Sequence, residues 1–331
     1  MKLENHSHIP AYPLDSDEPA DAALRRILHH LLERIESNVQ GVLDDSDPEF
    51  LHDLRVTTRR TRSALDQLRS ILPKKSTADF RRDFRWLGDL TGPLRDFDVW
   101  LEALRKEPYL SLKEPVIPLK NLICEHRASA MSQVKTALHS ARFRSLLAQW
   151  RLYLDSPNTT EESPKNAARP IGPIASLRIH KAYERILKRH RRMGPEPTPS
   201  ELHKLRISAK KLRYLLEFFA GLYPPERIQP IIEQLKRLQD ILGAANDLQI
   251  QQSWLLKFAA YPPAGAQSRD PAPAVFRLVE AALVRRLEDE HAAFLPCMRD
   301  FTSEETQGEI HNLFAVQELR VSPTTGMIVP R

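Results

Sequence analysis

Basic side chains recur at a fixed spacing in two stretches of the sequence. Residues 52–62 read HDLRVTTRRTR, and residues 203–213 read HKLRISAKKLR. At about 100° per residue, a helix would place one histidine and three cations of each stretch within an arc of roughly 80°. We call these two rows the basic stripes; they comprise His52, Arg55, Arg59 and Arg62 in the first and His203, Arg206, Lys210 and Arg213 in the second.

The residue types of the stripes are suited to binding a polyanion. Arginine forks hold phosphate oxygens in pairs, lysine supplies a point charge, and a protonated histidine donates a hydrogen bond. Like charges on one helix face repel each other, and we expect no carboxylate three or four positions away to relieve them. Each stripe would rise about 15 Å, so two could follow an extended chain for about 30 Å. The competing interpretation is an ordinary solvated face of charges.

The two stripes belong to a longer internal repeat with a constant offset of 151 residues. The offset relates His52 to His203 and continues without a gap to Asp96 and Asp247. Duplicated halves usually pack about a pseudo-two-fold axis, so we expect the stripes to lie close together. Further cations near the stripes are candidates to extend the path, namely Arg25, His29, Arg60, Arg85, Arg95, His180, Arg189, Lys211 and Lys236.

Apolar residues at helical spacing lie opposite the cations and predict the elements that position them. No stretch alternates as a strand would. The expected helices span about 19–42, 47–73, 77–91, 96–108, 115–139, 143–154, 174–192, 199–223, 227–242 and 273–298. Asp47 and Thr198 are expected to start the two stripe helices, while Gly92 and Gly243 are expected to break the helices that follow. Asp96 or Asp98 would then cap the next segment.

The predicted fold is all-α, with two similar four-helix bundles related by a pseudo-two-fold. We expect a first bundle over residues 15–155, a second over 172–300, and a tail over 301–331 in which Phe314, Val316 and Val321 hint at an extended segment. The polar, proline-bearing residues 155–173 would link the halves.

Composition is consistent with a helical, water-exposed protein of mild basic charge. The chain has 331 residues, 41% of them hydrophobic, only 10 glycines, and a net charge of +6. Its two cysteines match no metal or redox spacing, and no signal sequence precedes the first helix, which indicates a reducing cytoplasm. No apolar run reaches the 18 or so residues of a membrane span.

Two alternatives come from other functional classes. The same cations could neutralise a nucleic-acid backbone. Against a specific nucleic-acid partner, the stripes lack interleaved aromatic residues for base stacking, apart from Tyr214 nearby. A metal-dependent phosphohydrolase is the other alternative, because several carboxylates recur in the repeat: Asp89, Asp96, Asp98, Asp240 and Asp247. Motifs of the common enzyme classes are absent, and neither stripe histidine has a metal-ligand partner at i+4. We therefore expect no catalysis, no metal and no cofactor.

Four segments together carry a resemblance to a known family. They are His52-x-x-Arg55-Val56-x-x-Arg59-Arg60-x-Arg62, Leu90-x-Gly92-x-x-Arg95-Asp96-x-Asp98, His203-x-x-Arg206-Ile207-x-x-Lys210-Lys211-x-Arg213-Tyr214 and Leu242-Gly243-x-x-Asn246-Asp247. With these motifs the chain resembles CHAD proteins, the conserved histidine α-helical domain family, over about residues 15–300. The resemblance implies a basic central surface that binds inorganic polyphosphate, with the eight stripe residues as ligands, and association with cytoplasmic polyphosphate granules. CHAD domains are often fused to a CYTH domain, for which the residues before the first helix leave no room. Asn246 stands where the first half has Arg95, so the halves differ there.

Overall fold

The structure is a computed structural model that describes residues 12–106, 116–156, 164–195, 197–260 and 272–315. Within these ranges the regular structure is helical and no strand forms. The helices are α1 (Ala20–Asp44), α2 (Pro48–Gln67), α3 (Lys74–Leu90), α4 (Gly92–Ala103), α5 (Ile117–Leu138), α6 (Ala141–Asp155), α7 (Ile171–His190), α8 (Pro199–Phe219), the short 3-10 helix η3 (Ala220–Leu222), α9 (Pro225–Ala260), α10 (Ala272–Phe301) and α11 (Glu304–Leu313). The predicted all-α fold is confirmed.

The stripe helices begin where local sequence predicts. The Asp47 carboxylate accepts a hydrogen bond from the Glu49 amide, and Pro48 occupies the first turn of α2. Thr198 and Glu201 form a reciprocal capping box at the start of α8. These caps satisfy amides that a helix cannot pair internally, so they fix where the stripes begin.

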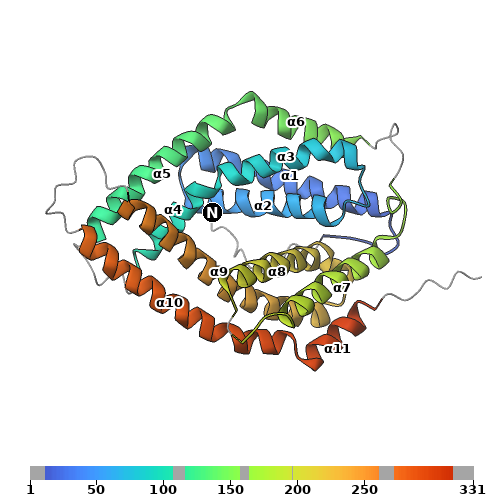
Figure 1. Cartoon of the computed structure of the whole chain (residues 1–331). Helices are drawn as coiled ribbons and strands as arrows, with labels where there is room; N and C mark the ends of the chain where they lie inside the picture. Colours follow the sequence, from blue (N-terminus) through green and yellow to red (C-terminus); the bar gives the residue numbers. More distant parts are fainter. Residues whose placement is uncertain (1–11, 107–115, 157–163, 196, 261–271, 316–331) are drawn as a thin grey trace, which may run out of the picture.

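Helices α2 and α8 lie side by side in the middle of the molecule (Figure 1). Helices α1, α3, α5 and α6 lie on one side of this central pair, and α7, α9, α10 and α11 lie on the other. Each central helix packs against the helix before it and the helix after it, α1 and α3 for α2, and α7 and α9 for α8. The two halves therefore present their stripe helices to each other in the same structural context.

Among the described residues the hydrophobic interior forms two clusters, and both contain residues from both halves. One includes Leu28 and Trp150 of the first half together with Ile179 and Phe218 of the second. The other joins α4 and α5 to α9 and α10. Residues 155–173 therefore separate the two halves along the sequence, but the hydrophobic packing continues from one half into the other.

The segments that lead into α1 and α7 exchange hydrogen bonds reciprocally. The Ala20 amide donates to the Arg169 carbonyl at 2.9 Å, and the Ile171 amide donates to the Glu18 carbonyl at 3.0 Å. Both partners obey the 151-residue offset, since Ala20 corresponds to Ile171 and Glu18 to Arg169. A two-fold relation between the halves would produce this reciprocity.

The predicted break at Gly243 is wrong. Helix α9 runs without interruption for 36 residues through Gly243, whereas α3 and α4 do separate at Thr91. Pro93 follows Gly92 and has no amide to donate, while its counterpart in the second half is Ala244. Glycine alone costs a helix only about 1 kcal/mol, so packing overrides it.

Several predicted boundaries also need correction. Asp96 and Asp98 cap nothing, because α4 begins at Gly92 and contains both. Helix α2 ends at Gln67 rather than Pro73, and α3 begins at Lys74. Within the expected tail, α11 is helical with Phe314 buried at its end, while Val316 and Val321 lie outside the described residues.

Candidate functional site

Cations from both stripes meet where α2 and α8 adjoin. The Gln67 amide donates to the Lys211 carbonyl at 3.0 Å and ties the two helices together. Four basic side chains and two carboxylates gather at this junction, and their charges act on the pKa of Arg55, Asp96, Arg206 and Lys210. We call this group the central cluster; it comprises Arg55, Arg59, Asp96, Arg206, Lys210 and Asp247.

Lys210 has the most unfavourable surroundings of the central cluster. Burial, followed by the charges of Arg59 and Arg206, lowers the pKa of Lys210 to about 6. Within the described residues its ammonium has no hydrogen bond or ion pair. The guanidinium of Arg59 has none either, and its Nε is buried without a partner. An anion bound here would meet the unpaired guanidinium of Arg59 and would favour the charged form of the unpaired Lys210 amine.

Arg55 is held more firmly than Arg59. Its Nη1 donates to the Gly88 carbonyl and to the Thr91 hydroxyl, both at 2.9 Å. Burial, then the charge of Arg59, lowers the pKa of Arg55 to about 10. These two bonds fix the guanidinium against the junction of α3 and α4, so Arg55 is positioned before any ligand arrives.

The two carboxylates of the central cluster neutralise it only in part. Asp247 lies 3.9 Å from Arg206. Burial raises the pKa of Asp96 to about 6, partly offset by Arg55 and reinforced by the negative charge of Asp247. Asp96 and Asp247 are repeat equivalents, as are Arg55 and Arg206, so the attraction between an arginine and an aspartate recurs in both halves.

The ends of the stripes are less free than the sequence suggests. The expectation that no carboxylate lies three or four positions from a stripe cation is wrong, because Glu217 accepts from Arg213 Nε at 2.6 Å. Glu217 is 2% exposed and also binds Arg60 of α2 at 2.7 Å. This carboxylate therefore links α2 to α8, and Arg60 and Arg213 are both engaged in ion pairs with this buried group. Sequence reasoning missed Glu217 although its i+4 spacing was visible.

Arg62 lies against the glycine of α3 that also accepts from Arg55. A Cβ on Gly88 would come within 2.8 Å of Arg62 Nη1, so the absence of a side chain permits the approach. In the second half the equivalent Arg213 donates to the side chain of Gln239, which corresponds to Gly88. Of the stripe histidines, His52 is half-buried and His203 is exposed.

The additional candidate cations divide into two groups. Arg25 donates to the Tyr153 carbonyl, His29 pairs with Asp155, Arg95 lies 3.7 Å from Glu49, and His180 packs against His311. The structure thus engages these four elsewhere and does not support their place in the path. Arg85 and Lys236 are exposed repeat equivalents on α3 and α9, and Arg85 lies one turn from Gly88. Lys211 is half-buried beside Lys210, and Arg189 lines a separate pocket on α7.

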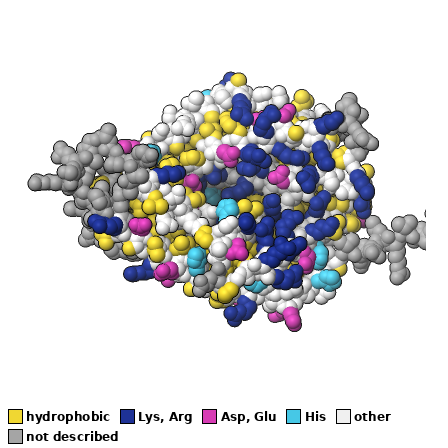
Figure 2. All heavy atoms as spheres, viewed as in Figure 1, with side chains coloured by type: hydrophobic (Ala, Val, Ile, Leu, Met, Phe, Trp, Pro, Cys, Tyr) yellow, Lys and Arg dark blue, Asp and Glu magenta, His cyan; other side chains and the backbone are white. Residues whose placement is uncertain are grey.

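The surface around the stripes is strongly cationic. Figure 2 shows Lys and Arg side chains spread over α3, α2, α8 and α7 on one face, with few acidic side chains among them. Individual weak contacts along such a face would add up for a long anion but not for a small one.

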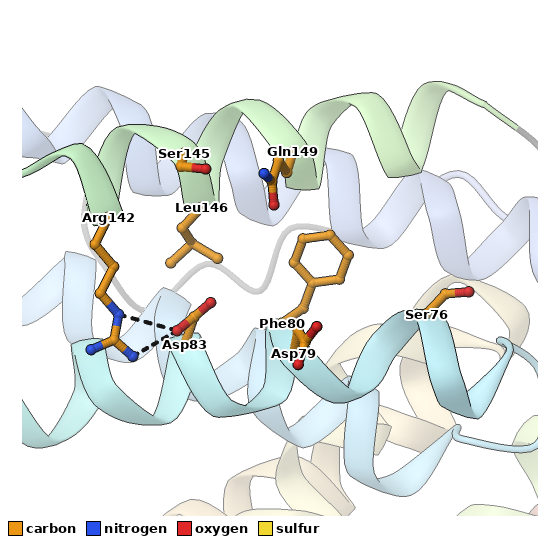
Figure 3. A pocket seen from close by; sticks show the side chains of 8 residues that line it. All are labelled: Ser76, Asp79, Phe80, Asp83, Arg142, Ser145, Leu146 and Gln149. Carbon is orange, nitrogen blue, oxygen red and sulfur yellow. Dashed lines mark hydrogen bonds and ion pairs between the residues drawn. The ribbon is translucent and has the colours of Figure 1, made fainter.

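Another pocket lies between α3 and α6 and is unsuited to an anion (Figure 3). Arg142 reaches across it to Asp83 at 2.6 Å and stacks 4.1 Å from the centre of the Trp86 ring. Its one cation is therefore already paired. In the described part of the chain, no three His, Cys, Asp or Glu side chains are placed to hold a metal ion. None of the described helices combines the length and the apolarity that crossing a membrane requires.

Comparison with known proteins gives a consistent assignment. The family model for the CHAD domain matches residues 26–256. The crystal structure of the CHAD domain from the plant Ricinus communis is similar with a TM-score of 0.71 and 25% identity, covering 89% of this chain and 97% of that one. PptA from Streptomyces chartreusis shares the fold, with a TM-score of 0.65 and 17% identity over 85% of this chain and 99% of that one. No curated protein matches the sequence.

Proposed function

The chain belongs to the CHAD domain family, and from this premise we propose that it binds inorganic polyphosphate along its two basic stripes. The proposal includes a role without catalysis and a place on cytoplasmic polyphosphate granules, as the family resemblance implies.

One observation carries the proposal, namely the crowding of unpaired cations from both stripes at the centre of the molecule. Arg59 of α2 lies close enough to Lys210 of α8 for its charge to lower the pKa of that lysine, and neither side chain has a partner among the described residues. Crowding of this kind is unfavourable for folding, and proteins keep such strain mostly where a ligand relieves it. A linear chain of phosphates offers the repeated negative charge that both helices lack.

The test is charge reversal at the two facing cations. Arg59→Glu and Lys210→Glu, singly and together, should weaken binding of a long polyphosphate, because each removes a basic side chain that is charged in the complex and adds a repelling anion. A short chain could still occupy the intact stripe of a single variant, so the advantage of long over short chains should shrink. Calorimetry with chains of defined length measures both effects, and circular dichroism confirms the fold.

The matched control is Arg285→Glu, which reverses an exposed cation on α10, away from the stripe helices. Its affinity should stay within about twofold of the wild type, since exposed charges separated by more than a Debye length are screened. Folded single variants that keep the full wild-type preference for long chains would refute a shared path.

A phosphohydrolase is favoured by one observation, the approach of Asp96 to Asp247. A two-metal site would bring carboxylates together in this way. Phosphate release from polyphosphate, measured with and without Mg²⁺ or Mn²⁺, separates the two functions. The binding proposal expects no release above the uncatalysed rate.

A further inference from the structure

A second group of cations lines a pocket between the end of α7 and the start of α8. Its basic lining comprises Arg185, Lys188, Arg189, Arg192 and Lys204, with Glu201 as the acidic neighbour. We call it the flanking pocket. Among the described residues none of the five cationic side chains has a hydrogen bond or an ion pair, and the Nε of Arg189 is buried without a partner.

Glu201 offsets the charge of this lining only in part, through its interaction with Lys204. Its carboxylate is held by the backbone amide and hydroxyl of Thr198 at 2.9 and 2.7 Å, as the cap of α8. These hydrogen bonds lower the pKa of Glu201 and orient it toward its own helix end. In the lining of this pocket, as far as the structure describes it, the five cations therefore face a single carboxylate.

The dipole of α7 explains only part of the arrangement. Lys188 and Arg189 lie in its last turn, where cations offset the negative helix end. Arg185 lies before that turn, and Lys204 belongs to another helix. A helix end carries about half an elementary charge, far less than five cations supply.

The equivalent place in the first half is filled and neutral. There Phe50 stands in place of Glu201, and its ring occupies the space that a Cβ on Gly41 would enter. Asp53 stands in place of Lys204 and pairs with Arg34 at 3.8 Å. The same position of the repeat is therefore filled by side chains in the first half, whereas in the second half it is a pocket with a cationic lining. Packing of the fold does not require the cations, so a ligand accounts for them better.

The flanking pocket adjoins the second stripe. Lys204 directly follows His203, which begins that stripe, and both side chains are exposed. Cationic side chains continue over α8 and α7 on the same face of the molecule (Figure 2). A chain that leaves the stripe at His203 meets Lys204 about 100° around the same helix.

We propose that the flanking pocket is a second binding segment for the same polyphosphate chain, which passes from the central cluster over His203 onto α7. This inference rests on the proposed function, and it makes the binding path asymmetric: it extends beyond the stripes in the second half only.

The test compares two variants that each lose two exposed cations. Lys188→Gln with Arg192→Gln removes charge from the flanking pocket, and Lys120→Gln with Arg285→Gln removes the same charge from α5 and α10. Titration with polyphosphate of about 100 units should show about a threefold to tenfold loss of affinity for the pocket variant, and little loss for the control. At saturation the pocket variant should also cover fewer phosphates per protein, and its affinity should depend less steeply on salt.

The outcomes separate the two proposals. If the pocket variant matches the control in affinity, coverage and salt dependence while Arg59→Glu/Lys210→Glu loses binding, the flanking segment is wrong and the central site stands. If the wild type does not bind polyphosphate, or the central double variant binds as well as the wild type, the proposed function itself fails.

Discussion

Lys210 makes the central cluster sensitive to pH. Its pKa of about 6 leaves the amine largely uncharged at neutral pH in the free protein, and the charged groups that act on it are Arg59, Arg206, Asp247 and Arg55. A polyanion placed against the amine favours the charged form and raises that pKa. Asp96, whose pKa is also about 6, would shift in the same direction.

We therefore predict that polyphosphate binding takes up protons and weakens as the pH rises from 6 to 8. One linked proton changes affinity by up to about tenfold per pH unit. Lys210→Arg should flatten the profile, because a guanidinium keeps its charge, whereas Lys120→Arg on α5 should leave it unchanged. Calorimetry in buffers of different ionisation enthalpy counts the protons. An equal affinity at pH 6 and 8, with no proton uptake, would contradict this assignment.

The carboxylates of the central cluster give a second prediction at this scale. Asp247→Asn removes a negative charge 3.9 Å from Arg206, so we expect polyphosphate to bind about threefold to tenfold more tightly, since a half-exposed charge is partly screened. Asp96→Asn should act in the same direction, most strongly above pH 6. A phosphohydrolase that uses these residues would instead lose turnover. Weaker binding by both variants would count against our interpretation of the two acids.

Single residues show where sequence reasoning stops. The spacing of Arg55, Arg59 and Lys210 was sufficient to place them on the polar faces of their helices, because helical periodicity is local. The capture of Arg60 and Arg213 by Glu217 was not predictable from periodicity, since it depends on how α2 and α8 pack. The partners of Arg25 and His29 were not predictable for the same reason, as they lie on α6.

Among the helices, the two halves differ most in the segments that directly follow the stripe helices. Helices α3 and α4 are separated at Thr91, whereas α9 is continuous. The difference between Pro93 and Ala244 would have predicted this from the sequence. The prediction relied instead on Gly92 and Gly243, which both halves share. Start signals such as Asp47 and Thr198 were predictable, since a cap acts within one helical turn.

We predict that proline and alanine are not interchangeable at these equivalent positions. Ala244→Pro should cost about 3 kcal/mol of stability or more, because it removes a hydrogen bond inside α9 and crowds the preceding turn. Pro93→Ala should change stability by less than about 1 kcal/mol, since the exposed proline lies in the first turn of α4. Urea unfolding followed by circular dichroism measures both. A tolerated Ala244→Pro would mean that α9 is as easily interrupted as its counterpart.

At the scale of the whole molecule, the shared hydrophobic clusters determine how the protein unfolds. Because each cluster draws on both halves, neither half keeps its interior when the other unfolds. We predict one cooperative thermal transition, with coincident curves from tryptophan fluorescence and circular dichroism. Phe218→Ala on α8, at the 0% exposed core, should lower the midpoint without splitting the transition. Two separated transitions would show that the halves are autonomous.

The 151-residue offset makes a geometric prediction for an experimental structure. Residues 50–98 should superpose on 201–249, with His52 on His203, apart from the interruption at Thr91. A crystal structure would measure this overlay directly, and different folds in the two segments would end the repeat argument. The contact between the two stripe helices was predictable from the offset. The hydrophobic clusters that contain residues of both halves were not.

The reciprocal hydrogen bonds between the segments leading into α1 and α7 have a consequence for evolution. In a dimer of identical subunits, such a contact is made twice by one sequence, so every substitution appears at both sites. Here both partners lie on one chain, and each can mutate alone. Phe50 and Glu201 occupy equivalent positions yet differ in size and charge. Covalent linkage therefore allows this chain to keep the reciprocal backbone contacts while side chains at equivalent positions differ.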